Sequence, residues 1–163
     1  MKKIYAMAMM LLLSVGAYAQ SGKSIYNKYS DLEDVSAVYI SPAMFRMIGQ
    51  LPDLDVEASD GEKVDIAPLI RSFEGFYLLN VSDKVQAAEL KQEVQAMIRS
   101  GSFEVLVEAK DSGSTMRIYT VGDDKVISSL VMLAHEDDSV QFICLEGNIN
   151  RKDFESLITK SIK

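Results

Sequence analysis

The sequence predicts an α+β fold: a mostly antiparallel sheet with a C-terminal meander, and helices packed mainly on one face. Two observations support this. Apolar residues recur at helical spacing over 82–99 and again over 151–162. Between them, residues 103–145 alternate apolar and polar side chains. Because short connections favour antiparallel pairing of consecutive strands, helices and strands are expected in separate blocks. The connections are the short polar breaks at 111–114, 122–124 and 136–138.

The first elements lie in the N-terminal third. Residues 20–33 are polar and mixed, and predict an irregular lead-in or a short helix anchored by Tyr26 and Tyr29. The β-branched and aromatic run Val35–Ile40 predicts a strand. Ser41-Pro42 then opens a helix, because serine caps a helix and proline suits its first position.

An acidic, turn-rich segment follows this helix, which Gly49 and Pro52 end. Residues 53–64 contain the turn sequence Asp60-Gly61 and predict either a loop or a short polar hairpin. Asp65–Ser72 predicts a short helix capped by Asp65.

The clearest helix of the chain comes next. Phe76–Val81 is a compact apolar run and predicts a buried strand. Ser82-Asp83 starts a helix that reaches about Arg99, and Gly101 lies past its end. Its apolar face consists of Ala87, Leu90, Val94, Met97 and Ile98.

The meander and a last helix complete the chain. Gly147–Asn150 predicts a turn, and Arg151–Ile162 an amphipathic helix. The apolar positions of the predicted strands are Phe103-Val105-Val107-Ala109, Met116-Ile118, Val126-Leu130-Met132 and Ile143-Leu145.

The N-terminus predicts export. Lys2 and Lys3 precede an uncharged, mostly apolar run, which ends at Ala17-Tyr18-Ala19. A signal peptidase accepts small side chains in this pattern, and the run is shorter than the ~20 residues that span a bilayer. We therefore expect residues 1–19 to be a cleaved signal peptide and residues 20–163 to form one domain in the periplasm or outside the cell.

The charge of the chain argues against two classes of partner. The formal net charge is −7, and removal of Lys2 and Lys3 makes it more negative. An acidic domain repels nucleic-acid phosphates and anionic membrane surfaces. We expect no nucleic-acid partner and no stable membrane insertion after cleavage.

No residue pattern predicts catalysis, a metal or another cofactor. His135 precedes Glu136-Asp137-Asp138, which is more typical of a solvated acidic hairpin than of a metal site. Cys144 is the only cysteine, and its apolar neighbours predict a buried, unreactive thiol. We therefore expect a protein that is not an enzyme.

The two faces of the meander are both apolar. Alternation assigns one set of side chains to the face that packs on the helices: Phe103, Val105, Val107, Ile118, Leu130, Met132, Ile143 and Leu145. The other face holds Leu106, Tyr119, Val131, Leu133, Phe142 and Cys144, flanked by Glu104, Glu108 and Arg117. This second face is either covered by a helix or the N-terminal segment, or it binds a partner. The candidate interaction residues are Leu106, Arg117, Tyr119, Val131, Leu133 and Phe142.

Several short segments carry a family resemblance. Tyr29-Ser30-Asp31, Val35–Ile40, the run from Ser41 to Met47 and Gly147-Asn148-Ile149 resemble a family of small exported bacterial proteins, known only as domain of unknown function 4252. The resemblance implies export and a single domain. It implies no activity and no catalytic residue.

These observations together predict an exported, non-enzymatic interaction or accessory module of the cell envelope. The expected partner is another envelope protein or a second copy of the chain. The alternative is a periplasmic carrier that binds a small apolar ligand between sheet and helices.

Overall fold

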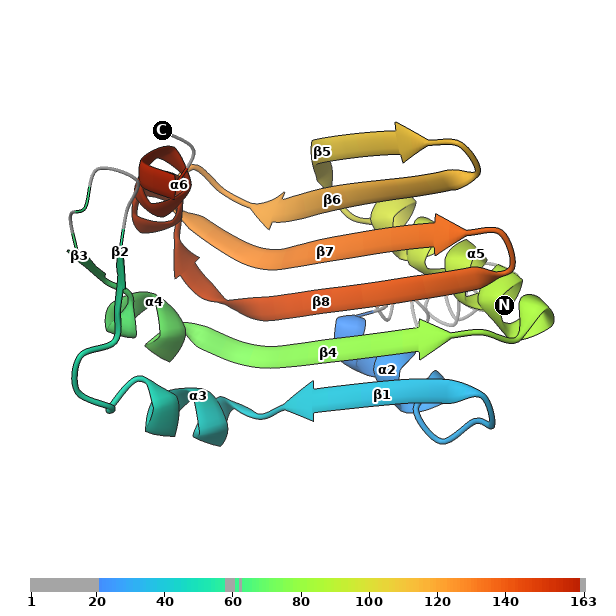
Figure 1. Ribbon diagram of the computed structural model, residues 1–163, viewed down its shortest axis with the longest axis horizontal. Helices are drawn as coiled ribbons and strands as arrows, with labels where there is room; N and C mark the ends of the chain where they lie inside the picture. Colours follow the sequence, from blue (N-terminus) through green and yellow to red (C-terminus); the bar gives the residue numbers. More distant parts are fainter. Residues whose placement is uncertain (1–20, 58–60, 62, 162–163) are drawn as a thin grey trace, which may run out of the picture.

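The computed structural model describes residues 21–57, 61 and 63–161, so the expected signal peptide lies outside the described residues. Within them, six strands form one antiparallel sheet in the order β1-β4-β8-β7-β6-β5, and β2 and β3 form a separate hairpin (Figure 1). The predicted α+β fold with a C-terminal meander is confirmed. In chain order the elements are α2 (Gly22–Tyr29), β1 (Val35–Ile40), α3 (Pro42–Ile48), β2 (Asp55–Glu57), β3 (Lys63–Asp65), α4 (Ala67–Arg71), β4 (Phe73–Val81), α5 (Lys84–Ser100), β5 (Glu104–Asp111), β6 (Ser114–Gly122), β7 (Val126–Glu136), β8 (Ser139–Asn150) and α6 (Arg151–Ser161).

Side-chain caps start four of the described helices. The Ser21, Ser41, Asp83 and Asn150 side chains accept hydrogen bonds from the backbone N–H groups of Ser24, Met44, Gln86 and Asp153. The lead-in therefore forms a helix, which is one of the two predicted outcomes. The acidic segment likewise forms the predicted hairpin, β2–β3.

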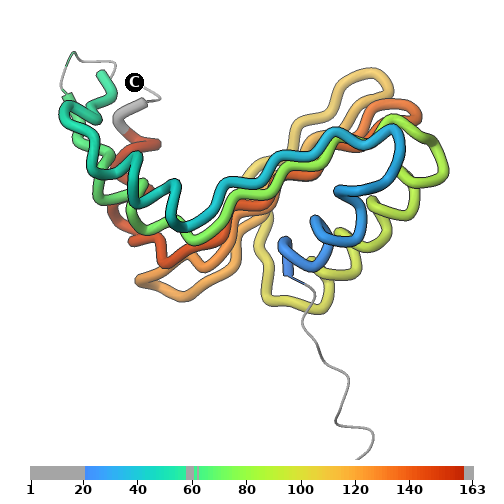
Figure 2. Tube along the Cα trace, turned by 90° about the horizontal axis from the view of Figure 1, so that it is seen from below, coloured from blue at the N-terminus to red at the C-terminus, as the bar shows by residue number. Residues whose placement is uncertain are grey.

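The main core lies between the sheet and two helices. Figure 2 shows α2 and α5 side by side under one end of the sheet, and we call the face that they cover the inner face. From the helices, Ile25, Tyr29, Ala87, Leu90, Val94 and Met97 enter this core. From the strands it receives Tyr77, Leu79, Val81, Tyr119, Val131, Leu133, Val140, Phe142 and Cys144.

The other helices gather at the far end of the sheet. Figure 2 shows α3, α4 and α6 turned toward the opposite side from α2 and α5. The Phe45 ring there packs edge-on against Phe73, with 5.2 Å between ring centroids. This arrangement leaves the middle of the second face, which we call the outer face, without a helix in front of it (Figure 1).

The structure corrects the prediction of which meander face packs on the helices. Tyr119, Val131, Leu133 and Phe142, which were predicted to lie on the second face, are at most 7% exposed in the core. Ile118, Leu130, Met132, Ile143 and Leu145, predicted to pack on the helices, lie on the outer face. Alternation separates the two faces of a sheet, but it does not say which of two apolar faces carries the helices.

A bulge also changes the first meander strand. The register between β5 and β6 shifts between Val105 and Val107. Val105 therefore pairs with Tyr119 of the inner face, whereas Val107 pairs with Ile118 of the outer face. An extra residue in a strand reverses the alternation beyond it, and the sequence pattern carried no sign of this.

Two smaller predictions were wrong. Gly147–Asn150 does not form a turn, because β8 continues to Asn150 and pairs with Val126 at its end. Ile66 rather than Asp65 occupies the N-cap of α4, although Asp65 Oδ1 accepts a hydrogen bond from Ala67 N at 2.8 Å.

Candidate functional site

Four of the six candidate interaction residues lie in the core. Tyr119, Val131, Leu133 and Phe142 pack against α2 and α5, so a partner cannot reach them while these helices stay in place. The other two, Leu106 and Arg117, are at the surface. Leu106 is 46% exposed on the bulge of β5, and Arg117 forms an ion pair with Glu108.

The outer face carries a continuous apolar row instead. One residue from each strand of the sheet lies in register with the next, and we call this set the outer row. The outer row consists of Val38, Leu78, Ile143, Met132, Ile118 and Val107. Its two end members, Val38 and Val107, are 46% and 44% exposed, and the four residues between them are partly exposed. A second, shorter row runs beside the outer row and consists of Ile40, Phe76, Leu145 and Leu130.

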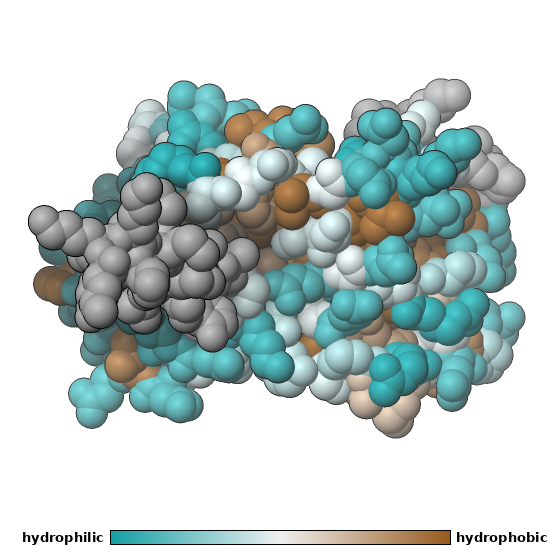
Figure 3. Space-filling view, turned by 180° about the vertical axis from the view of Figure 1, so that it is seen from behind, coloured by the Kyte–Doolittle hydropathy of each residue, from teal (hydrophilic) through white to brown (hydrophobic). Residues whose placement is uncertain are grey.

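The helix-covered side of the molecule looks different. Seen from that side, hydrophilic atoms dominate, and the hydrophobic atoms gather mostly in the upper half, toward the edge where Figure 1 places β5 and β6 (Figure 3). Val105 and Leu106 of β5 are 56% and 46% exposed. The outer row is the apolar surface that crosses the whole sheet, whereas the exposed apolar side chains of the inner face lie at its two edges, Val105 on β5 and Tyr39 on β1.

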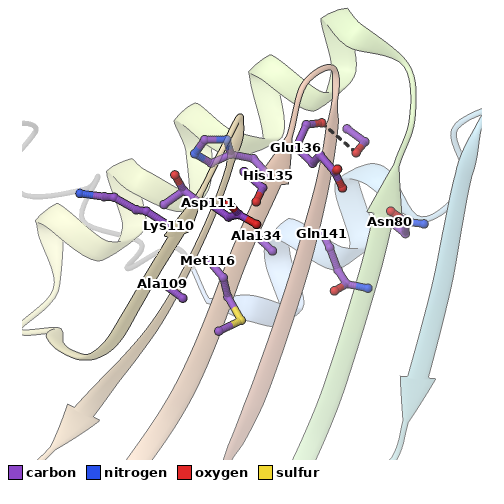
Figure 4. A pocket seen from close by; sticks show the side chains of 12 residues that line it. Asn80, Ala109, Lys110, Asp111, Met116, Ala134, His135, Glu136 and Gln141 are labelled. Atoms are coloured by element: carbon purple, nitrogen blue, oxygen red, sulfur yellow. Dashed lines mark hydrogen bonds between the residues drawn. The ribbon is translucent and has the colours of Figure 1, made fainter.

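A hollow of about 480 Å³ with polar groups at its rim adjoins the outer row at the end of the sheet that carries the hairpin turns (Figure 4). Its floor is the row of residues that lies beside the outer row on the side of the hairpin turns. Two small side chains in this row, Ala109 and Ala134, leave space. Asn80 and Gln141 supply amide groups, and Asp111 and Glu136 supply carboxylates at the rim. This combination favours a ligand group that donates hydrogen bonds and carries positive charge.

His135 does not contribute its ring to this hollow. Its register partner Val140 belongs to the inner core, and Figure 4 shows the imidazole and Lys110 pointing away from Gln141 and Asn80. Burial lowers the pKa of His135, and the positive charges of Lys91 and Arg117 lower it further. Among the described residues no group of three or more His, Cys, Asp or Glu side chains is placed to hold a metal ion.

Cys144 is buried, as predicted, at 1% exposure. Its Sγ lies 3.4 Å from Ser129 Oγ and 3.9 Å from Glu146 Oε1. Burial is the main cause that raises the pKa of the thiol to about 12. Because Cys144 pairs with Val131 and His135 lies four residues further along β7, about 13 Å at strand spacing, the imidazole cannot deprotonate the thiol.

One feature of the sequence pointed toward the correct face assignment. Gln141 of β8 and Asn80 of β4 share a face with Ile143 and Leu78. The alternate positions of β8, from Val140 to Cys144, are all apolar. A face that carries amide side chains in its central strands is the one nearer to water. The identity of the outer-row residue on each strand, by contrast, depends on the register, which only the structure provides.

None of the described helices is long and apolar enough to cross a membrane. Comparison with known families gives one match: a model described as "Domain of unknown function (DUF4252)" matches residues 29–157. No curated protein and no solved structure matches the chain. Most of α2 therefore precedes the matched residues, although its Ile25 and Tyr29 help to close the core.

Proposed function

We propose that this chain, which belongs to the DUF4252 family, is an exported, non-enzymatic interaction module of the cell envelope, and that its outer row docks a partner protein. The observation that carries the proposal is the outer row: apolar side chains in register on every strand of the sheet, on the face opposite α2 and α5. Extended apolar surface on a soluble domain is typical of a binding site.

The hollow beside the outer row favours a partner that carries a positively charged side chain at this position. Asp111 and Glu136 are exposed at its rim, and the chain as a whole is acidic. A partner that covers the outer row with apolar side chains and places a lysine or arginine in the hollow satisfies both features. Charge complementarity of this kind fixes the register of docking and accelerates association.

Two observations favour this role over the alternative carrier. The space between sheet and helices is filled by side chains that are 0% exposed, such as Leu90, Val131 and Phe142. A cleft of about 380 Å³ at the start of α2 is lined by three serines, by Met97 and Phe103, and by the carboxylates of Glu74 and Glu146, which suit an apolar ligand poorly.

Export is part of the proposal and rests on the N-terminal sequence. The two lysines, the apolar run and Ala17-Tyr18-Ala19 are arranged as a secretion machinery requires. A partner in the cell envelope follows from that destination.

Photo-crosslinking in the producing bacterium tests the proposal. A photoreactive amino acid replaces Met132 in the middle of the outer row, or Gln92 on the exposed side of α5 as the control. The expected result is a discrete crosslinked product from position 132 and none from position 92. The product should weaken when Asp111→Lys and Glu136→Lys are introduced together. Equal crosslinking from both positions, or none from position 132, contradicts docking on the outer row.

A further inference from the structure

The two edges of the sheet differ in how they are protected. β5 forms one edge, and it carries a bulge next to Leu106 and four charged side chains. Bulges and charges keep an edge from pairing with other chains. β1 forms the other edge, and its sequence Val-Ser-Ala-Val-Tyr-Ile has no charge, proline or glycine. Its pairing with β4 is regular over its whole length, and no described strand pairs with its free side.

Exposed apolar side chains concentrate along this edge. Figure 2 shows β1 nearest to the viewer, with α3 following it along the same edge. The side chains at the two ends of the edge are 41% exposed at Leu32 and 65% exposed at Met47. We call the set the β1-edge patch; it consists of Leu32, Val38, Tyr39, Met44, Met47 and Leu51, all exposed.

We propose that the β1-edge patch binds a second copy of this chain, by antiparallel pairing of the two β1 strands about a two-fold axis at Val38. Residues that face each other in such a pair lie on the same face of the sheet, so the axis must pass through a residue. An axis at Val38 places the outer rows of the two copies end to end, and the two sheets become one. This inference does not depend on what the outer row docks.

The same register places one end of the β1-edge patch in the first copy beside the opposite end of the patch in the second copy. Leu32 precedes Val38 by as many residues as Met44 follows it, and α3 begins directly after β1. Antiparallel pairing therefore brings the turn before β1 in one copy next to α3 of the other. Leu32 then packs near the Met44 and Met47 side chains of the second copy, and the symmetry repeats this contact.

Charge complementarity supports a second copy as the occupant. The turn contains Asp31, Glu33 and Asp34, whereas α3 contains Arg46 and no acidic residue. Within the described part of the chain none of these four side chains forms an ion pair. In the dimer each acidic turn lies beside the Arg46 side chain of the other copy. Any unrelated partner would have to supply the same reversed arrangement of charges.

The mass of the purified protein in solution, measured by light scattering across a concentration series, is the first test. We expect a dimer that Val38→Lys converts into a monomer, because a lysine at the axis faces its own copy. Val107→Lys is the matched control: a valine of similar exposure at the other end of the outer row, whose substitution should leave the dimer intact. A monomeric wild type, or dissociation by Val107→Lys as well, overturns the proposal.

Disulfide formation tests the register without relying on a charged variant. In the dimer, Val38→Cys places two thiols directly across the axis, within the Cα separation that a disulfide requires. Ser36→Cys, on the same face, places them four residues apart, or about 13 Å. Cys144 is buried and should not interfere. Rapid crosslinking of Val38→Cys alone supports the proposal, whereas equal rates, or crosslinking of Ser36→Cys alone, overturn it.

Discussion

The Cys144 thiol lies where β8 meets the start of α2. A Cβ on Gly22 would collide with its Sγ, and Gly22 N donates a hydrogen bond to Glu146 Oε1 at 3.0 Å. Burial of Cys144 was predicted from its apolar neighbours. Its contact with Gly22 was not, because a helix residue more than one hundred positions away in the chain leaves no trace in the local pattern.

A thiol reagent should label Cys144 slowly in the native protein. The pKa of about 12 leaves almost no thiolate at neutral pH, and the surrounding side chains exclude the reagent. We expect labelling to become fast in denaturant, as followed by mass spectrometry. Fast labelling of the native protein would contradict the burial of the thiol.

His135 should contribute to loss of stability in acid. Its pKa in the folded protein is lower than the ordinary value of 6.5, so the unfolded chain binds the proton first as the pH falls. Its contribution is fully present above 6.5 and is lost progressively below that value. We expect the free energy of unfolding of His135→Gln, measured with urea, to fall less than that of the wild type between about pH 7 and about pH 5. If the free energy of unfolding changed equally with pH in the variant and the wild type, the pKa of His135 would not be lowered in the folded protein.

At the scale of elements, the inner face of the sheet is the core and the outer face is not. Tyr119→Ala with Phe142→Ala should therefore destabilise the fold, by about 3–5 kcal/mol for Phe142 alone. The reason is that Phe142 is 0% exposed and its removal leaves a cavity against the helices. Chemical denaturation measures the loss, with Asn80→Ala on the outer face as a control that should change stability by under about 0.5 kcal/mol. Equally small losses of stability in the double variant and in Asn80→Ala would mean that the helices lie on the other face of the sheet.

The existence and order of the elements were largely predictable from the sequence. Helical spacing predicted α5, a capping serine and a proline predicted α3, and β-branched residues predicted β1. The bulge at Leu106 and the length of β8 were not predictable, because each depends on pairing between strands and a single strand does not encode its register. The meander face that carries the helices was predicted wrongly, although the amides of Gln141 and Asn80 indicated the correct one.

At the scale of the whole molecule, α2 and α5 cover the inner face of the sheet, no helix covers the middle of the outer face, and the β1 edge has neither a bulge nor a charged side chain. The outer row and the β1-edge patch share Val38, so a dimer would extend the docking surface rather than cover it. The sequence predicted that an apolar face would remain for a partner, but it placed the candidate residues on the face that the helices cover.

Export gives a prediction at this scale. The Lys-apolar-Ala-x-Ala arrangement predicts cleavage after Ala19. N-terminal sequencing of the protein from the periplasm or the medium should begin at or next to Gln20. A mature protein that retains the apolar run from Met7 to Leu13 would contradict the prediction and with it the envelope role.

The native methionines allow the central claim, docking on the outer row, to be tested most directly. Met132 belongs to the outer row and Met116 lies beside it, both partly exposed, whereas Met97 is 3% exposed in the inner core. Mass spectrometry measures the oxidation rate of each methionine in intact cells and in the purified protein. The account predicts that Met132 and Met116 are oxidised more slowly in cells than in the purified protein, while Met97 is slow in both. Equal rates for Met132 and Met116 in cells and in the purified protein would contradict docking on the outer row.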